Sequence, residues 1–182
     1  IPGALFIGLN GGFAPWVGAL ISDINQPILL VVQEGRFEEA ITRLARVGYD
    51  NSLGYLEGGM EAWVQAGKTT EQITSITAKE FEQRFNTKSI AVLDVRKDGE
   101  YNSAHLEGNH IEHLSLNSIH QKIQGIESQK TYHVYCGGGY RSVIATSILK
   151  ANGFSNVIDI AGGFAALKKT QLPIANGVCN AE

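Results

Sequence analysis

One stretch of the sequence combines a nucleophile with a backbone that can surround an anion. Cys136 ends an apolar run and is followed by three consecutive glycines and then by a helical pattern. Glycines let the backbone curl so that successive N–H groups point inward, and such a nest at the start of a helix binds anions. These groups favour the thiolate, which is the nucleophilic form of cysteine. We therefore predict a reactive thiolate at Cys136, which could also hold an added sulfur as an anion. The predicted loop consists of Gly137, Gly138, Gly139, Tyr140, Arg141 and Ser142.

Other residues near apolar runs could support this loop or have purely structural roles. A lone cysteine at a strand end is usually a small buried hydrophobic residue, but the glycines, Arg141 and the following helix together favour the reactive interpretation. Asp94 and Arg96 are predicted to hold the loops by hydrogen bonds, and the alternative is that Arg96 attracts an anionic donor.

Cys179 is predicted to be an exposed free thiol, with a role as second sulfur acceptor as the alternative.

Three histidines lie close together in the sequence, at His105, His110 and His113. Such spacing on a strand or loop is a weak indication of metal binding. We therefore predict structural roles for them and no metal site.

The composition limits the class of protein. Of 182 residues, 43% are apolar and 18% are charged, and the net charge is −3. This excludes intrinsic disorder as the main state and gives no indication of a nucleic-acid-binding surface. Residues 1–21 are mostly apolar but are interrupted by glycine, proline and asparagine, so we predict neither a membrane helix nor a signal peptide. Two cysteines fit a reducing compartment, and we predict a cytoplasmic location.

An internal repeat organises the chain. Glycines recur in the same order 104 or 105 residues apart, and GFSNVIDIAGG (153–163) is similar to GYDNSLGYLEGG (48–59). We interpret this as two copies of one unit. The paired positions are Gly35 with Gly139, Gly58 and Gly59 with Gly162 and Gly163, and Gly3 with Gly108.

The second copy alternates apolar runs with helical patterns, which predicts an α/β fold with parallel strands and right-handed crossovers. Thr77 and Glu80 form a predicted capping box before a helix that contains Phe81 and Phe85. The predicted strands are 89–95, 111–116, 131–135 and 156–160, and the predicted helices lie near 117–125, at 141–151 and after Gly163.

The first copy repeats this order but has no counterpart of residues 75–104. A polar link at 67–76 is the predicted domain boundary. The predicted strands are 4–8, 28–32 and 53–56, and the predicted helices are 13–22, 36–47 and 59–66.

Three motifs together resemble the rhodanese-like sulfurtransferases: LDVRKDGEYNSAHLEG (93–108), YCGGGYRS (135–142) and NVIDIAGG (156–163). The resemblance covers residues 75–174 and places the family's catalytic cysteine at Cys136. Members often have a tryptophan after the Gly-Gly pair, where this chain has Phe164 to Leu167. That departure concerns packing and leaves the chemistry unchanged.

The first copy resembles the same family in a degenerate form. Aligning Gly35 with Gly139 places Val32 at the position of Cys136, and Glu34 and Glu38 put negative charge in the loop. We therefore predict an inactive structural or docking domain. The predicted organisation is a truncated rhodanese-like domain at 1–70, an active one at 75–175 and a tail at 176–182.

The resemblance implies transfer of sulfane sulfur from thiosulfate or a low-molecular-weight persulfide to a thiol or cyanide, without a cofactor. Cys136 to Arg141 spans six residues, whereas relatives that act as phosphatases have one more, so phosphatase and arsenate reductase activities are disfavoured. The alternative is a sulfur-sensing or docking module that does not turn over. The order of inactive and active copies is similar to bacterial fusions with a preceding metallo-β-lactamase-fold domain. We expect such a domain upstream of Ile1 as a partner in persulfide metabolism.

Overall fold

The computed structural model describes residues 1–85 and 90–177. Ser89 and Cys179, which the sequence predictions include, lie outside the described residues. The chain separates into two compact units. Unit 1 comprises Ile1–Pro2 and Ile7–Glu71, and unit 2 comprises Gly3–Phe6 and Gln72–Glu182.

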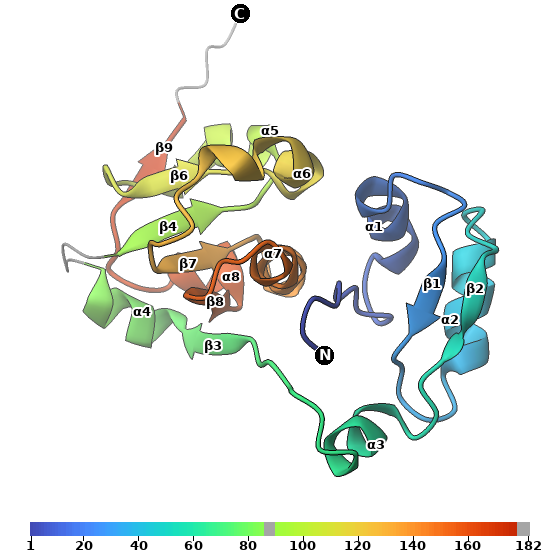
Figure 1. Ribbon diagram of the computed structural model, residues 1–182. Coiled ribbons are helices and arrows are strands. Elements are labelled where there is room, and N and C mark those ends of the chain that lie inside the picture. Colours follow the sequence, from blue (N-terminus) through green and yellow to red (C-terminus); the bar gives the residue numbers. More distant parts are fainter. Residues whose placement is uncertain (86–89, 178–182) are drawn as a thin grey trace, which may run out of the picture. The chain divides into compact units, whose positions relative to one another are not determined.

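Unit 2 is built on a parallel sheet of five strands in the order β3-β8-β7-β4-β6 (Figure 1). Every residue of β4 and β7 is buried, because both strands lie inside the sheet and helices cover its faces. The strands are β3 (Thr74–Thr77), β4 (Ala91–Asp94), β6 (Ile111–His113), β7 (Tyr132–Tyr135) and β8 (Val157–Ala161).

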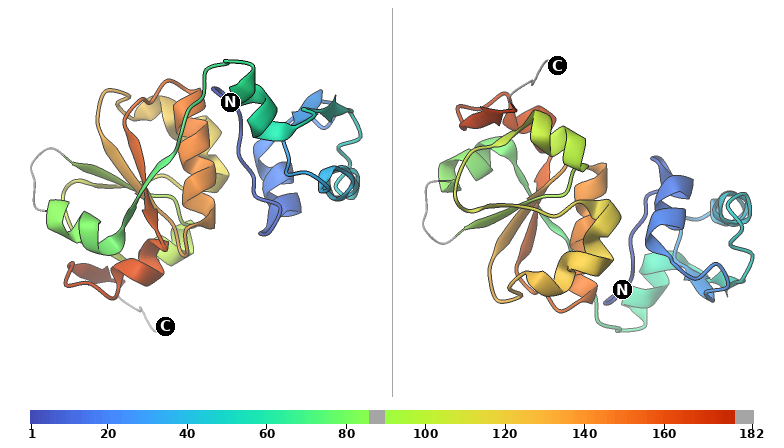
Figure 2. Two further views of the ribbon diagram at one scale, coloured as in Figure 1. Left: turned by 90° about the horizontal axis from the view of Figure 1, so that it is seen from below. Right: turned by 90° about the horizontal axis from the view of Figure 1, so that it is seen from above.

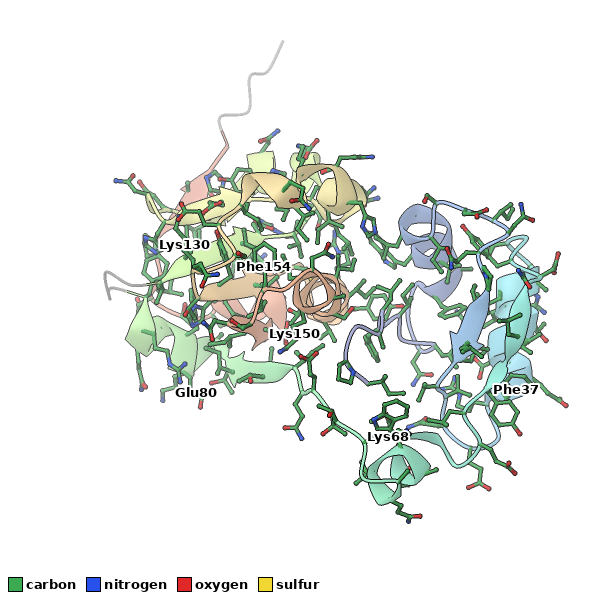
Figure 3. All side chains as sticks on the ribbon, viewed as in Figure 1. Phe37, Lys68, Glu80, Lys130, Lys150 and Phe154 are labelled. Atoms are coloured by element: carbon green, nitrogen blue, oxygen red, sulfur yellow. The ribbon has the colours of Figure 1, made fainter. Side chains whose placement is uncertain are left out.

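Helices lie on both faces of this sheet, as expected for parallel strands (Figure 2). On one face, α4 (Ala78–Arg84) and α8 (Gly163–Leu167) cover an apolar core that includes Phe81, Tyr135 and Ile160. On the other face lie α7 (Tyr140–Ala151) and α6 (Ile119–Lys122), the latter between the short 3₁₀ turns η1 (Leu116–Ser118) and η2 (Ile123–Gly125). Phe154 follows α7 (Figure 3). Its ring packs beside that of Tyr132, with 6.1 Å between ring centroids.

The predicted capping box is present at the start of α4. The Thr77 Oγ1 atom accepts a hydrogen bond from the Glu80 N–H at 3.2 Å, and the Glu80 carboxylate accepts one from the Thr77 N–H at 2.7 Å. The box satisfies two N–H groups at the helix start, so the local pattern specifies where α4 begins.

Besides β3, three short elements of unit 2 were not predicted. They are α5 (Asp98–Ser103), β5 (Ala104–Leu106) and β9 (Ile174–Asn176), and the last two form an antiparallel pair. Three-residue strands are too short to show an alternating pattern in the sequence.

Unit 1 contains α1 (Phe13–Leu20), β1 (Ile28–Leu30), α2 (Phe37–Ala45), β2 (Ser52–Tyr55) and α3 (Gly59–Gln65). This order agrees with the helices and the last two strands predicted for the first copy. β1 and β2 pair in parallel. Four buried side chains form the core: Phe13, Val17, Leu44 and Tyr49.

The strand predicted at residues 4–8 is absent, so this prediction was wrong. Its counterpart in unit 2 is β6, which pairs only with β4 among the described strands. The described part of unit 1 has no counterpart of β4, and Gly3–Phe6 belong to unit 2, where the Phe6 N–H donates to Ser147 Oγ at 3.0 Å. Residues 4–8 therefore lack a neighbouring strand with which to form a ladder. The division between the two units follows Glu71, inside the polar link at 67–76, although the last residues of that link belong to β3.

The backbone repeats at the same spacing as the glycines. Gly35 and Gly139 both have positive φ, at 75° and 104°, and so do both Gly-Gly pairs. The repeat has different surroundings in the two units. Leu29 and Leu53 are 73% and 63% exposed, whereas His133 and Val157, 104 residues later, are buried. Unit 1 thus exposes strand positions whose counterparts in unit 2 are buried.

Candidate active site

Cys136 follows the last residue of β7 and precedes α7. The carboxyl ends of parallel strands are the usual place for ligand sites in α/β folds. Its side chain is buried, whereas Gly138 in the loop is exposed. A donor must therefore reach the sulfur through the loop, which favours a small or protruding sulfur atom.

Hydrogen bonds form a closed circuit around the Cys136 sulfur. The Gly139 N–H donates to Sγ with an N···S distance of 3.1 Å. The thiol donates to Ser142 Oγ at 3.6 Å, and the Ser142 hydroxyl donates to the Gly139 carbonyl at 3.0 Å. A preformed N–H aimed at Sγ stabilises negative charge on a Cys136 thiolate without reorganisation.

Glycine is needed at different positions of the loop for different physical reasons. Gly139 has φ of 104°, a left-handed conformation that other residues rarely adopt, and it turns the chain into α7. A Cβ on Gly137 would lie 2.9 Å from Arg141 Nη2 and 3.5 Å from Glu100 Oε1, so this glycine makes room for the side chains beside it. Around Gly138 the space is open.

The first turn of α8, which begins at the Gly-Gly pair that marked the repeat, holds the loop by two backbone hydrogen bonds. The Phe164 N–H donates to the Cys136 carbonyl at 2.6 Å, and the Ala165 N–H donates to the Gly137 carbonyl at 3.0 Å. This approach requires Gly163, because a Cβ there would lie 2.3 Å from the Cys136 oxygen. Two carbonyl oxygens that would repel an anion are thereby engaged by α8.

Arg141 forms a bidentate ion pair that sequence reasoning did not anticipate. Its Nη1 and Nη2 atoms lie 2.5 Å and 2.7 Å from the two carboxylate oxygens of Glu100, on α5. The hydrogen bonds from Arg141 lower the pKa of Glu100 to about 2, and the same pairing raises the pKa of Arg141. The guanidinium of the predicted loop is therefore paired with a carboxylate.

Asp94 and Arg96 form a second, buried ion pair at the end of β4. Arg96 Nε lies 2.9 Å from both Asp94 carboxylate oxygens, and Nη2 donates to the Ala104 carbonyl at 2.7 Å. The guanidinium also lies 4.0 Å from the centre of the Phe164 ring. The hydrogen bonds connect β4 with β5, and the ring contact reaches α8. That this pair holds the loops and that Arg96 attracts a donor both stay predictions.

The three histidines do not converge. His105 and His113 each stack on Tyr101, with 4.0 Å and 4.3 Å between ring centroids, whereas His110 packs against Phe85. Over residues 1–85 and 90–177, no group of three or more His, Cys, Asp or Glu side chains could hold a metal ion.

The corresponding loop of unit 1 keeps the backbone frame but not the chemistry. Gly59 stands opposite the Val32 carbonyl as Gly163 stands opposite that of Cys136, although less closely, with 3.4 Å between its ideal Cβ and the oxygen. Gln33 and Glu34 replace the first two glycines. Arg36 pairs with Glu39 at 2.7 Å.

The rhodanese-like domain family model matches residues 1–66 and 77–170. The chain belongs to this family. The two matched segments correspond to the two copies read from the sequence, and the parallel sheet with helices on both faces confirms the predicted α/β fold.

Curated relatives of this rhodanese-like chain include sulfurtransferases. Thiosulfate sulfurtransferase GlpE of Pseudomonas fluorescens is 32% identical over 88 residues, covering 48% of this chain and 79% of the relative. The putative sulfur carrier protein YrkF of Bacillus subtilis is 27% identical over 99 residues, covering 54% and 52%. The probable adenylyltransferase/sulfurtransferase MoeZ of Mycobacterium tuberculosis is 28% identical over 101 residues, covering 55% and 26%. The chain thus spans about half of YrkF and a quarter of MoeZ, and these relatives support sulfur transfer as the general chemistry.

Solved structures show the same fold. A rhodanese-like domain protein from Staphylococcus aureus is 25% identical, with a TM-score of 0.50, and the match covers 57% of this chain and 100% of that one. A rhodanese-related protein from Thermoplasma volcanium is 26% identical, with a TM-score of 0.50 and coverages of 56% and 97%.

Sequence reasoning missed two residues of this rhodanese-like site. Glu100 lies within the motif 93–108, but its partner is 41 residues away, so no local spacing indicates the pair. Gly163 was noticed as a repeat marker. Its recurrence at Gly59 was the signal that the position has a backbone role.

Proposed function

We propose that this chain is a sulfurtransferase in which Cys136 carries sulfane sulfur as a persulfide. The observation that carries the proposal is the Gly139 N–H aimed at the Cys136 sulfur at 3.1 Å, in a glycine loop at the start of α7. The similarity to GlpE, named a thiosulfate sulfurtransferase, supports the same chemistry.

In the first step, the Cys136 thiolate attacks the outer sulfur of a donor such as thiosulfate or a low-molecular-weight persulfide. A bond forms between the two sulfur atoms, and the bond between the donor's outer and inner sulfur breaks. Sulfite, or a thiolate, leaves with the electron pair. The negative charge then resides on the terminal sulfur, one atom further from Cys136, within reach of the loop N–H groups.

In the second step, a thiolate or cyanide attacks the terminal sulfur and takes it. The bond to Cys136 breaks, and its electron pair returns to the Cys136 thiolate. Each step is a displacement at sulfur with no net oxidation, so the chain's own residues suffice. They hold the anion at Gly139 and leave the exposed Gly138 side of the loop open to the acceptor.

A second candidate is a sulfur-carrying or docking module that does not turn over. The similarity to YrkF, named a putative sulfur carrier protein, favours this alternative. In this case the Cys136 persulfide would be delivered to a partner protein. A metallo-β-lactamase-fold partner domain stays a prediction from the resemblance.

Among the described residues, no helix has the length and apolar character needed to cross a bilayer.

Steady-state kinetics separate the two candidates. The assay measures thiocyanate formed from thiosulfate and cyanide, together with the intact mass of the protein after incubation with thiosulfate alone. Continuous thiocyanate formation supports the enzyme. A single stoichiometric burst supports the carrier, and no sulfur on the protein with any donor would refute both.

Installing a cysteine in unit 1 is expected to create no activity. The Val32→Cys variant, in a Cys136→Ser background, would place a thiol near Glu34 and Glu38 in a loop without the three glycines. Neither the charge nor the backbone would then stabilise the anion. Thiocyanate formation above the Cys136→Ser background would show that the glycine loop contributes less than proposed.

A further inference from the structure

The Glu100–Arg141 pair lies directly against the loop. A Cβ on Gly137, the residue after the nucleophile, would lie within 3.5 Å of both a guanidinium nitrogen and a Glu100 oxygen. The two side chains are only partly exposed, 18% for Arg141 and 38% for Glu100. Any donor that enters the loop therefore meets both charges.

Pairing with Glu100 neutralises the positive charge of Arg141, which the loop would otherwise present to an anion. A bidentate carboxylate occupies both terminal nitrogens of Arg141, leaving no net charge on the pair. The Glu100 pKa of about 2 keeps its carboxylate ionised throughout the neutral range. Attraction of an anion then depends on the backbone N–H groups and the start of α7.

We propose that Glu100 is a specificity-determining residue, which weakens the binding of dianionic sulfur donors by neutralising Arg141 at the loop. This inference rests on the proposed sulfur transfer through Cys136. The unmodified loop thereby favours donors that bring one negative charge, such as a monoanionic persulfide or thiosulfonate, relative to thiosulfate with two.

Two donors of nearly the same shape test this inference. Methanethiosulfonate replaces one charged oxygen of thiosulfate with a methyl group, so it brings one negative charge where thiosulfate brings two. With either donor, the Cys136 thiolate attacks the outer sulfur and the sulfur–sulfur bond breaks. The leaving group that takes the electron pair is methanesulfinate in one case and sulfite in the other.

The test variant is Glu100→Gln, which keeps the shape and one acceptor for Arg141 but removes the charge. The ratio of kcat/KM for thiosulfate to kcat/KM for methanethiosulfonate should rise about three- to tenfold, mainly through a lower KM for thiosulfate. The rise should shrink as salt is added, because ions screen the partly exposed charges. The matched control is Asp98→Asn, which removes the same charge from the exposed start of α5 and should leave the ratio unchanged.

Binding measurements in a Cys136→Ser background give a readout that requires no turnover. Adding Glu100→Gln should lower the Kd of thiosulfate by about three- to tenfold relative to that of methanethiosulfonate. If the parent transfers no sulfur but this Kd ratio shifts, the proposed function fails and the role of Glu100 stands. If Glu100→Gln changes the Kd of both donors by the same factor, so that their ratio stays constant, Glu100 only supports the loop and the inference is wrong.

Discussion

A Cys136→Ser variant is expected to lose sulfur transfer by at least about 1,000-fold. The hydroxyl fits the space of the thiol and can keep the contacts with Gly139 and Ser142, so the fold should be unchanged. A serine hydroxyl is a far weaker nucleophile at neutral pH, and no base in the described loop circuit would activate it. The measurement is thiocyanate formation, with circular dichroism to check folding.

Cys179→Ser is the matched control, because it removes the other thiol of the chain. It should keep the parent's activity. After incubation with thiosulfate, intact-mass spectra should show an added sulfur, about 32 Da, on the parent and on Cys179→Ser but not on Cys136→Ser. Activity that disappears with Cys179→Ser and persists with Cys136→Ser would show that Cys179 is the nucleophile and that the assignment to Cys136 is wrong.

The parts of the site that lie within one turn of the chain could be read from the sequence. The strand–Cys136–glycine–helix order specifies where the sulfur lies, and the Gly139 N–H that donates to it is three residues away. The capping box at Thr77 specifies the start of α4 in the same way. In both cases the interacting groups are a few residues apart, so residue type and spacing determine the geometry.

The parts that depend on distant segments could not be read this way. Glu100 reaches Arg141 only because α5 and the loop meet in the folded unit, and Gly163 meets Cys136 only through the packing of α8. Residues 4–8 show the reverse case. Their apolar pattern suits a strand, but a strand needs a neighbour to pair with. Among the described residues, the first copy has no counterpart of β4, and Gly3–Phe6 belong to unit 2 without pairing with its sheet.

The contact between Gly163 and the loop leads to an expected loss of both stability and activity in a Gly163→Ala variant. The new Cβ would lie 2.3 Å from the Cys136 carbonyl oxygen, so α8 and the loop would have to separate. The left-handed φ of 53° adds strain of about 1–2 kcal/mol. The clash adds about 1–3 kcal/mol. A displacement of the loop by about 1 Å would lower sulfur transfer by about 100-fold.

Gly153→Ala separates strain from clash. Gly153 also has a left-handed φ, of 87°, but nothing lies within 4 Å of its ideal Cβ. This variant should lose about 1–2 kcal/mol of unfolding free energy and keep its sulfur transfer, because only the backbone conformation is affected. Urea unfolding and thiocyanate formation measured on both variants give the comparison. If Gly163→Ala is no less stable than Gly153→Ala and equally active, then α8 does not hold the Cys136 carbonyl, and the loop keeps its geometry without that support.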